Sequence, residues 1–73
     1  MKPTIGRIVH YTAETIEGAK TYAGIITAVY PSGSTVDLVT FGPGSIHHHE
    51  EVPLAPLTSE PMPGHWSWPP REP

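Results

Sequence analysis

The segment from Pro61 to Pro70 constrains the fold of this chain more than any other part of the sequence. It reads Pro-Met-Pro-Gly-His-Trp-Ser-Trp-Pro-Pro and holds both tryptophans of the 73 residues. Because proline cannot donate a backbone hydrogen bond and clashes inside a helix, the segment is expected to run extended, with Trp66 and Trp68 on one side. Large apolar side chains are rarely left at a frayed terminus, so this tail is predicted to dock on the body of the protein.

Two interpretations of the docked tail stay open. In the first, both tryptophans close a small hydrophobic core. In the second, one tryptophan belongs to the core, while the other lines a pocket for a flat ring together with His65.

The length of the chain allows one domain, residues 1–73. A domain of this size buries only about 60% of the surface that its unfolded chain exposes. The sequence has no cysteine, so neither a disulfide nor a thiolate zinc site can stabilise it. A self-associating interface would bury further apolar area, and we therefore expect a homodimer or a larger homo-oligomer.

The charge and hydropathy of the chain exclude several partners. The net charge is −3 and only four residues are lysine or arginine, so no basic face is expected that could bind DNA or long RNA. A small anionic ligand could still be held by one arginine, histidines and backbone N–H groups. No apolar run has the length of about 18 residues that a membrane span needs, and a cytoplasmic protein without membrane contact is expected.

The rest of the chain shows no helical periodicity, because glycine or proline interrupts almost every stretch of ten residues. Alternating β-branched and aromatic residues predict an all-β fold. The polar residues 12–20 are predicted to form a loop, with one helical turn at 13–17 as an option. The expected strands are residues 5–11, 21–30, 35–41 and 46–52, with a hairpin turn at 31–34, a break at 42–44 and a link at 53–57 into the tail.

These strands fit two layouts. We predict a small, highly twisted, partly open barrel of the SH3-like kind, with four to five strands within residues 1–57 and the docked tail at 58–73. A five-stranded open sheet is the competing layout. Residues 21–30 are apolar on both faces, which indicates a central strand or a face in an interface, and Tyr22 and Tyr30 are expected in the core.

One cluster, residues 47–51, suggests a metal site. On a strand His47, His49 and Glu51 share a face, which is a 2-His-1-carboxylate arrangement. A metal site also needs a further ligand and supporting hydrogen bonds, so the preferred interpretation is a charged edge strand that resists pairing with other chains. Neither a metal nor another cofactor is expected.

The sequence lacks the common catalytic motifs. It has no cysteine, no Gly-x-Ser-x-Gly elbow, no His-Glu-x-x-His motif and no phosphate-binding glycine loop. The protein is therefore predicted not to be an enzyme.

Aromatic rings and polar groups suited to recognition remain. A base stacked on an aromatic ring gains about 1–3 kcal/mol, so two rings and one arginine could hold a small nucleotide without a basic surface. Stacking is assigned to Tyr11 and Trp66, phosphate contact to Arg7, and contact with ring edges to two histidines and a threonine. The candidate ligand-binding residues are Arg7, His10, Tyr11, Thr40, His65, Trp66 and Trp68.

Several stretches of the sequence resemble a widespread group of very small bacteriophage and prophage proteins. These proteins typically begin with a Gly-Arg-Ile-Val-His-Tyr stretch and end with a Pro-Gly-Thr-Trp-His-Trp-Pro stretch, and the similarity covers essentially the whole chain. Here Ser67 stands where the group often has histidine, and His65 could take over a ligand contact of that residue. The matching stretches are Ile5 to Tyr11, Ala23-x-Ile25, the turn from His49 to Leu54, and Pro63-Gly64-x-Trp66-x-Trp68-Pro69.

The resemblance implies a function. The chain is similar to viral sponge proteins, which sequester cyclic-dinucleotide signals in the cytoplasm of the host bacterium and so silence its anti-phage immunity. Two alternatives stay open: an SH3-like module that binds a host or phage polypeptide through an aromatic groove, and a structural phage component.

Overall fold

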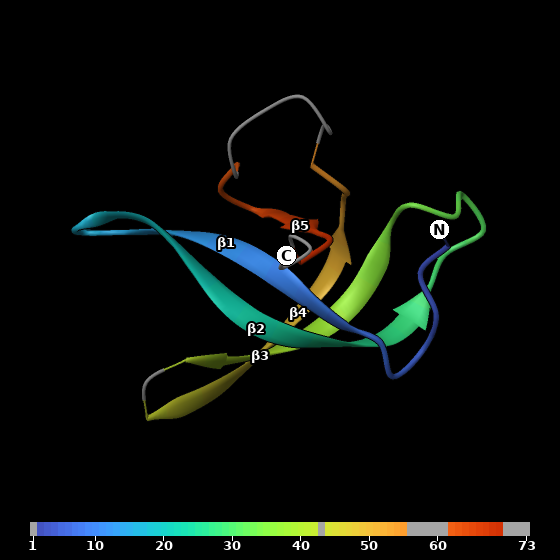
Figure 1. Cartoon of the computed structure of the whole chain (residues 1–73), viewed down its shortest axis with the longest axis horizontal. Coiled ribbons are helices and arrows are strands. Elements are labelled where there is room, and N and C mark those ends of the chain that lie inside the picture. Colours follow the sequence, from blue (N-terminus) through green and yellow to red (C-terminus); the bar gives the residue numbers. More distant parts are fainter. Residues whose placement is uncertain (1, 43, 56–61, 70–73) are drawn as a thin grey trace, which may run out of the picture.

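The computed structural model describes residues 2–42, 44–55 and 62–69, which form one antiparallel sheet (Figure 1). Its strands follow the order β4-β3-β2-β1-β5, so β4 and β5 are the edges. The predicted all-β class is confirmed, and within the described part of the chain no helix could span a membrane. The strands are β1 (Ile8–Thr15), β2 (Gly18–Val29), β3 (Val36–Gly42), β4 (Ser45–Val52) and β5 (His65–Ser67).

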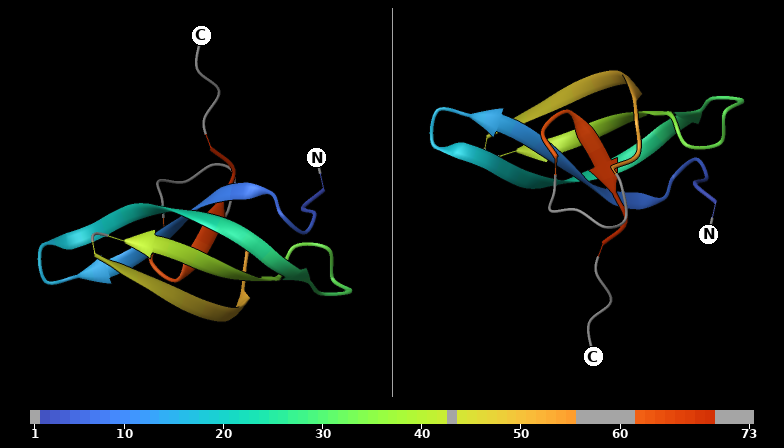
Figure 2. Two further views of the ribbon diagram at one scale, coloured as in Figure 1. Left: turned by 90° about the horizontal axis from the view of Figure 1, so that it is seen from below. Right: turned by 90° about the horizontal axis from the view of Figure 1, so that it is seen from above.

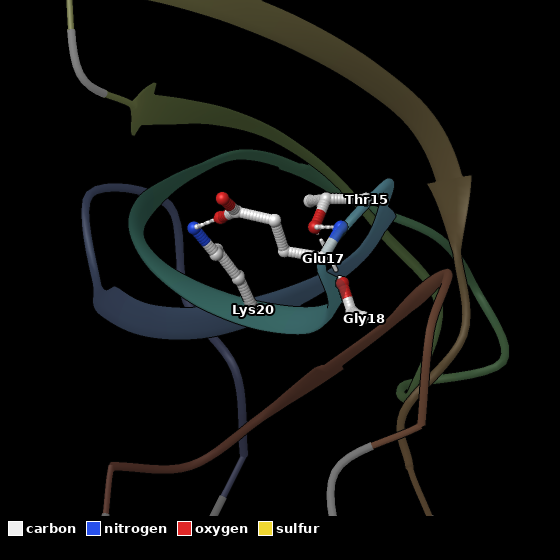
Figure 3. Close-up of polar contacts among 4 residues, drawn as sticks. All are labelled: Thr15, Glu17, Gly18 and Lys20. Carbon is white, nitrogen blue, oxygen red and sulfur yellow. Dashed lines mark hydrogen bonds and ion pairs between the residues drawn. The ribbon is translucent and has the colours of Figure 1, made fainter.

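The predicted loop at residues 12–20 is wrong, as is the optional helical turn within it. β1 and β2 pair without interruption as far as Thr15 and Gly18, so a two-residue turn replaces the loop. The Thr15 hydroxyl donates to the Gly18 carbonyl over 2.6 Å and accepts the Glu17 N–H, while Gly18 has φ +109° (Figure 3). Short polar residues suit such a tight hairpin as well as they suit a loop, and composition alone does not separate the two.

The first strand also begins later than predicted. Ile5 and Gly6 form a turn in which Gly6 has φ +90° and the Arg7 N–H donates to the Thr4 carbonyl over 3.1 Å. The chain then enters β1 at Ile8. The turn places Ile5 in solvent, with 72% of its surface exposed.

Two register irregularities curve the sheet, one between β2 and β3 and one between β3 and β4. In β4 the irregularity falls after His49, and Glu51 takes φ +51° while its N–H donates to Asp37 Oδ1 over 2.9 Å. This hydrogen bond, followed by one from Tyr30, lowers the pKa of Asp37, and Asp37 raises the pKa of Tyr30 to about 12. As a result the alternation of side chains between the two faces of β4 is shifted by one residue after His49, and Val52 rather than Glu51 is buried.

The hydrophobic core lies on one side of this sheet, called the inner face below. Trp66 is completely buried at its centre, and its Nε1–H donates to the Ser34 carbonyl over 2.9 Å. The prediction that the tail docks is thus confirmed. Tyr22 and Tyr30, by contrast, are only half-buried, so their predicted place in the core is wrong. The core cluster consists of Val9, Ile26, Val36, Leu38, Val52 and Trp66.

The docked tail also joins the two edges of the sheet at one point. β5 pairs with β1, where Trp66 lies opposite Tyr11. On its other side the Trp66 N–H donates to the Pro53 carbonyl and its carbonyl accepts the Ala55 N–H, over 3.0 and 2.8 Å. These contacts form a single bridge between Leu54 and Trp66, not a ladder, so the described edges meet only here. The proposed boundary between residues 57 and 58 lies outside the described residues.

Trp66→Ala should lower the free energy of unfolding by about 3–5 kcal/mol, because it removes the largest buried side chain and leaves a cavity. Trp68→Ala is the matched control, since Trp68 is only half-buried. Urea unfolding of both variants followed by circular dichroism measures the difference. Equal losses in the two variants would contradict the central place of Trp66 in the core.

Candidate ligand-binding pocket

A pocket of about 380 Å³ opens on the inner face, beyond the hydrophobic core. The β1–β2 and β3–β4 hairpins flank it and extend toward the same end of the molecule (Figure 2). Each of these four strands contributes side chains. The lining residues are Tyr11, Ala13, Thr15, Tyr22, Thr40, Gly42, Ser45, His47 and His49.

Strand register explains why these side chains meet. Tyr11 pairs with Tyr22 across β1 and β2, and Thr40 pairs with His47 across β3 and β4. Residues that pair directly across a sheet project to the same face, as do residues two positions apart on one strand. Val9 and Leu38, which precede Tyr11 and Thr40 by two positions, are core residues. The pocket and the core therefore occupy successive parts of one face.

Tyr11 and His49 form one wall of the pocket. Their rings stack with centroids 4.3 Å apart and planes inclined by 26°. His49 is fixed further by a hydrogen bond of 3.1 Å between its Nε2 and the Thr40 hydroxyl. Since Tyr11 also packs against the core, this wall is anchored from beneath.

His47 lies on the same face, with its ring centroid 6.4 Å from that of His49. Its Nε2 is 2.9 Å from the Ser45 hydroxyl. The sequence pattern placed Glu51 on this face as well, and that prediction is wrong because the bulge in β4 diverts it. Within the described residues no group of three histidine, cysteine or acidic side chains is arranged to hold a metal.

Among the residues that the structure describes, no lysine, arginine, aspartate or glutamate lines the pocket. Burial, followed by the neighbouring His47 and His48, lowers the pKa of His49. His49 is therefore neutral at neutral pH, and the described lining is mostly apolar, with uncharged polar groups among the rings. A second, shallower hollow shares Thr15 and Tyr22 with the pocket. Lys20 lines this second hollow.

The predicted site residues separate into three groups. Tyr11 and Thr40 line the pocket. Trp66 and Trp68 belong to the adjoining core instead, in an edge-to-face contact with centroids 5.1 Å apart, and the Arg7 guanidinium lies 5.6 Å from the centroid of Trp68. Trp66 has no exposed surface with which to stack on a ligand.

The remaining two predicted residues, His10 and His65, belong to the opposite, outer face. They alternate with Tyr11 and Trp66 along β1 and β5, and His65 Nδ1 lies 3.0 Å from the Pro63 carbonyl. The tail residues thus do not join Tyr11 and Thr40 in one site within a single chain.

Sequence reasoning missed several lining residues. The alternation of Ser45 and His47 on one strand indicates that they share a face. Which residues of β3 they pair with depends on the turn between the two strands. Ala13, Thr15 and Tyr22 could not be placed while residues 12–20 were taken as a loop. No known protein family, curated protein or solved structure matches this chain.

The lowered pKa of His49 predicts a pH-dependent stability. Below its ordinary value near 6.5 the unfolded chain binds the proton more readily than the fold does, so stability should fall as the pH drops from 6.5 toward the lower folded pKa. His49→Gln should remove this part of the pH dependence, whereas His48→Gln, on the exposed outer side, should largely keep it. Thermal unfolding from about pH 8 to about pH 5 measures both. An unchanged pH profile in His49→Gln would contradict the assignment.

Proposed function

We propose that the inner-face pocket binds the planar ring of a small nucleotide-type ligand and that the protein holds this ligand without cleaving it. The observation that carries the proposal is the stacked pair of Tyr11 and His49 beside Tyr22. Stacking on such rings is worth about 1–3 kcal/mol per base. The volume of 380 Å³ lies within the usual range for small-molecule sites and is sufficient for one base with its sugar.

Hydrogen-bonding groups around the rings suit the edge of a base. The Thr40 and Ser45 hydroxyls and the His47 imidazole each combine a donor and an acceptor. The described lining holds no fixed charge, which favours an uncharged ring over an ionic group in the interior of the pocket. The phosphates of the ligand would then lie at the mouth.

Among the described cations we assign the phosphate contact to Lys20, because it lines the adjoining hollow that shares Thr15 and Tyr22 with the pocket. It pairs with Glu17 only three residues away, and both side chains are largely exposed. Such surface ion pairs contribute about 0–1 kcal/mol, so a phosphate can displace the carboxylate. Phosphate contact is thereby transferred from Arg7, the residue assigned from the sequence, to Lys20.

The biological role follows from the sequence resemblance together with this pocket. A phage protein that retains a cyclic-dinucleotide messenger would lower its free concentration in the host and block anti-phage signalling by mass action. One pocket accommodates one ring, so the second base of a ligand with two bases would lie outside it. Release of intact ligand after denaturation is the chemical signature of this role.

A second candidate function uses the same pocket. Tyr11 and Tyr22 pair side by side and could form an aromatic groove for a proline-rich polypeptide, as in SH3-like modules. Such a module would bind extended peptides and ignore nucleotides.

Calorimetric titration with cyclic di- and trinucleotides, ADP-ribose derivatives and proline-rich peptides tests both candidates. Tyr11→Leu and His47→Ala should each weaken binding of the nucleotide, Tyr11→Leu by about tenfold or more, which corresponds to the loss of about 1.4 kcal/mol of stacking. Tyr30→Phe, a tyrosine outside the pocket, is the matched control and should bind like wild type.

Calorimetry is preferred to tryptophan fluorescence because neither tryptophan lines the pocket. Binding of peptides alone would favour the second candidate. Undiminished nucleotide binding by folded Tyr11→Leu and His47→Ala variants would overturn the assignment of this pocket, and recovery of a hydrolysed ligand would overturn sequestration.

A further inference from the structure

We propose that the outer face of the sheet is a contact surface between two copies of this chain. The surface consists of two cross-strand rows on β1 to β4, and it is called the outer patch below. Strand register joins the members of each row directly. The first row is Ile8, Ile25, Val39 and His48, and the second is His10, Ala23, Phe41 and Ile46.

The outer patch exposes large apolar side chains on paired strands of the sheet. Ile8, Phe41 and Ile46 leave 60%, 44% and 68% of their surfaces in solvent. Single exposed apolar residues are ordinary on protein surfaces, but a contiguous patch is typical of an interface. Phe41 and Ile46 are direct cross-strand neighbours at one end of the second row. His10 stands at the other end of that row, and Ile8 lies two residues from it on the same strand.

The charge of the outer patch fits a copy of itself. Neither row contains lysine, arginine, aspartate or glutamate, and each ends in one histidine. Contact between two such patches therefore buries no unpaired fixed charge. Burial of an unpaired charge would be strongly unfavourable. A strongly charged partner would find no complementary group within the rows.

The size of the outer patch is sufficient for a weak dimer. From the exposure of its side chains the patch offers on the order of 500 Å² per copy, so that contact removes about 1,000 Å² in total, near the lower limit for specific interfaces. A two-fold axis is the usual symmetry of such a dimer.

One orientation also matches the shapes of the side chains. If the two-fold axis runs along the strands, β1 of one copy covers β4 of the other and β2 covers β3. Each row then lies over the same row, which places Phe41 of one copy over Ala23 of the other and Ile25 over Val39. The large ring of Phe41 thereby packs on Ala23, which has the smallest side chain of the patch.

Light scattering after gel filtration, at about 100 µM chain, tests the proposal, because interfaces near the lower size limit bind weakly. Wild type should show twice the chain mass of 7.9 kDa. Phe41→Glu and Ile46→Glu should each be monomeric. Ile16→Glu is the matched control, because Ile16 is fully exposed at the tip of the β1–β2 hairpin and should leave the dimer intact.

The orientation is tested by exchanging two side chains. Ala23→Phe should weaken the dimer by placing two rings against each other, and Ala23→Phe combined with Phe41→Ala should restore it. A monomeric wild type, or a dimer that survives in both folded glutamate variants, would overturn the proposal. A wild-type chain that gains mass only with a different polypeptide would overturn it too. None of these outcomes depends on nucleotide binding.

Discussion

The burial of Trp66 is the interaction on which the rest of the structure depends. Its indole fills the centre of the core and donates to the Ser34 carbonyl, so it links the tail to the turn between β2 and β3. Its backbone pairs with Tyr11 on one side and bonds to Pro53 and Ala55 on the other. A chain without disulfides thus uses one tail residue to connect the beginning, middle and end of its described fold.

This arrangement also determines where a pocket can form. Trp66 and the aliphatic core occupy one part of the inner face, and β5, only three residues long, pairs with β1 no further than Thr12. Beyond that point the two long hairpins continue, and none of the described strands lies between their edges. The inner side chains there include the aromatic and polar residues of the pocket. The short tail strand therefore both completes the core and leaves the pocket open.

Local rules predicted the parts of the fold in which neighbouring residues decide the conformation. Proline and alternation were sufficient for the extended tail with Trp66 and Trp68 on one side, and the histidine strand is an edge strand as expected. The β1–β2 hairpin was missed because its turn is specified by one threonine hydroxyl and one glycine, within residues that also suit a loop. Glu51 was misplaced because a bulge depends on the partner strand, which the local pattern does not contain.

The candidate site shows the same limit at a larger scale. From the sequence alone, Tyr11 was grouped with the tail tryptophans. Tyr11 does pair with Trp66, but the rings that line the pocket with it are Tyr22 and His49, which come from two other strands. Alternation then separates the two faces: odd-numbered residues of β1 turn toward the core and pocket, while Ile8 and His10 turn outward. A single register thus assigns stacking rings to the inner face and an uncharged apolar patch to the outer one. In so small a domain, the proposed ligand binding and the proposed self-association are compatible because they would use opposite sides of the sheet.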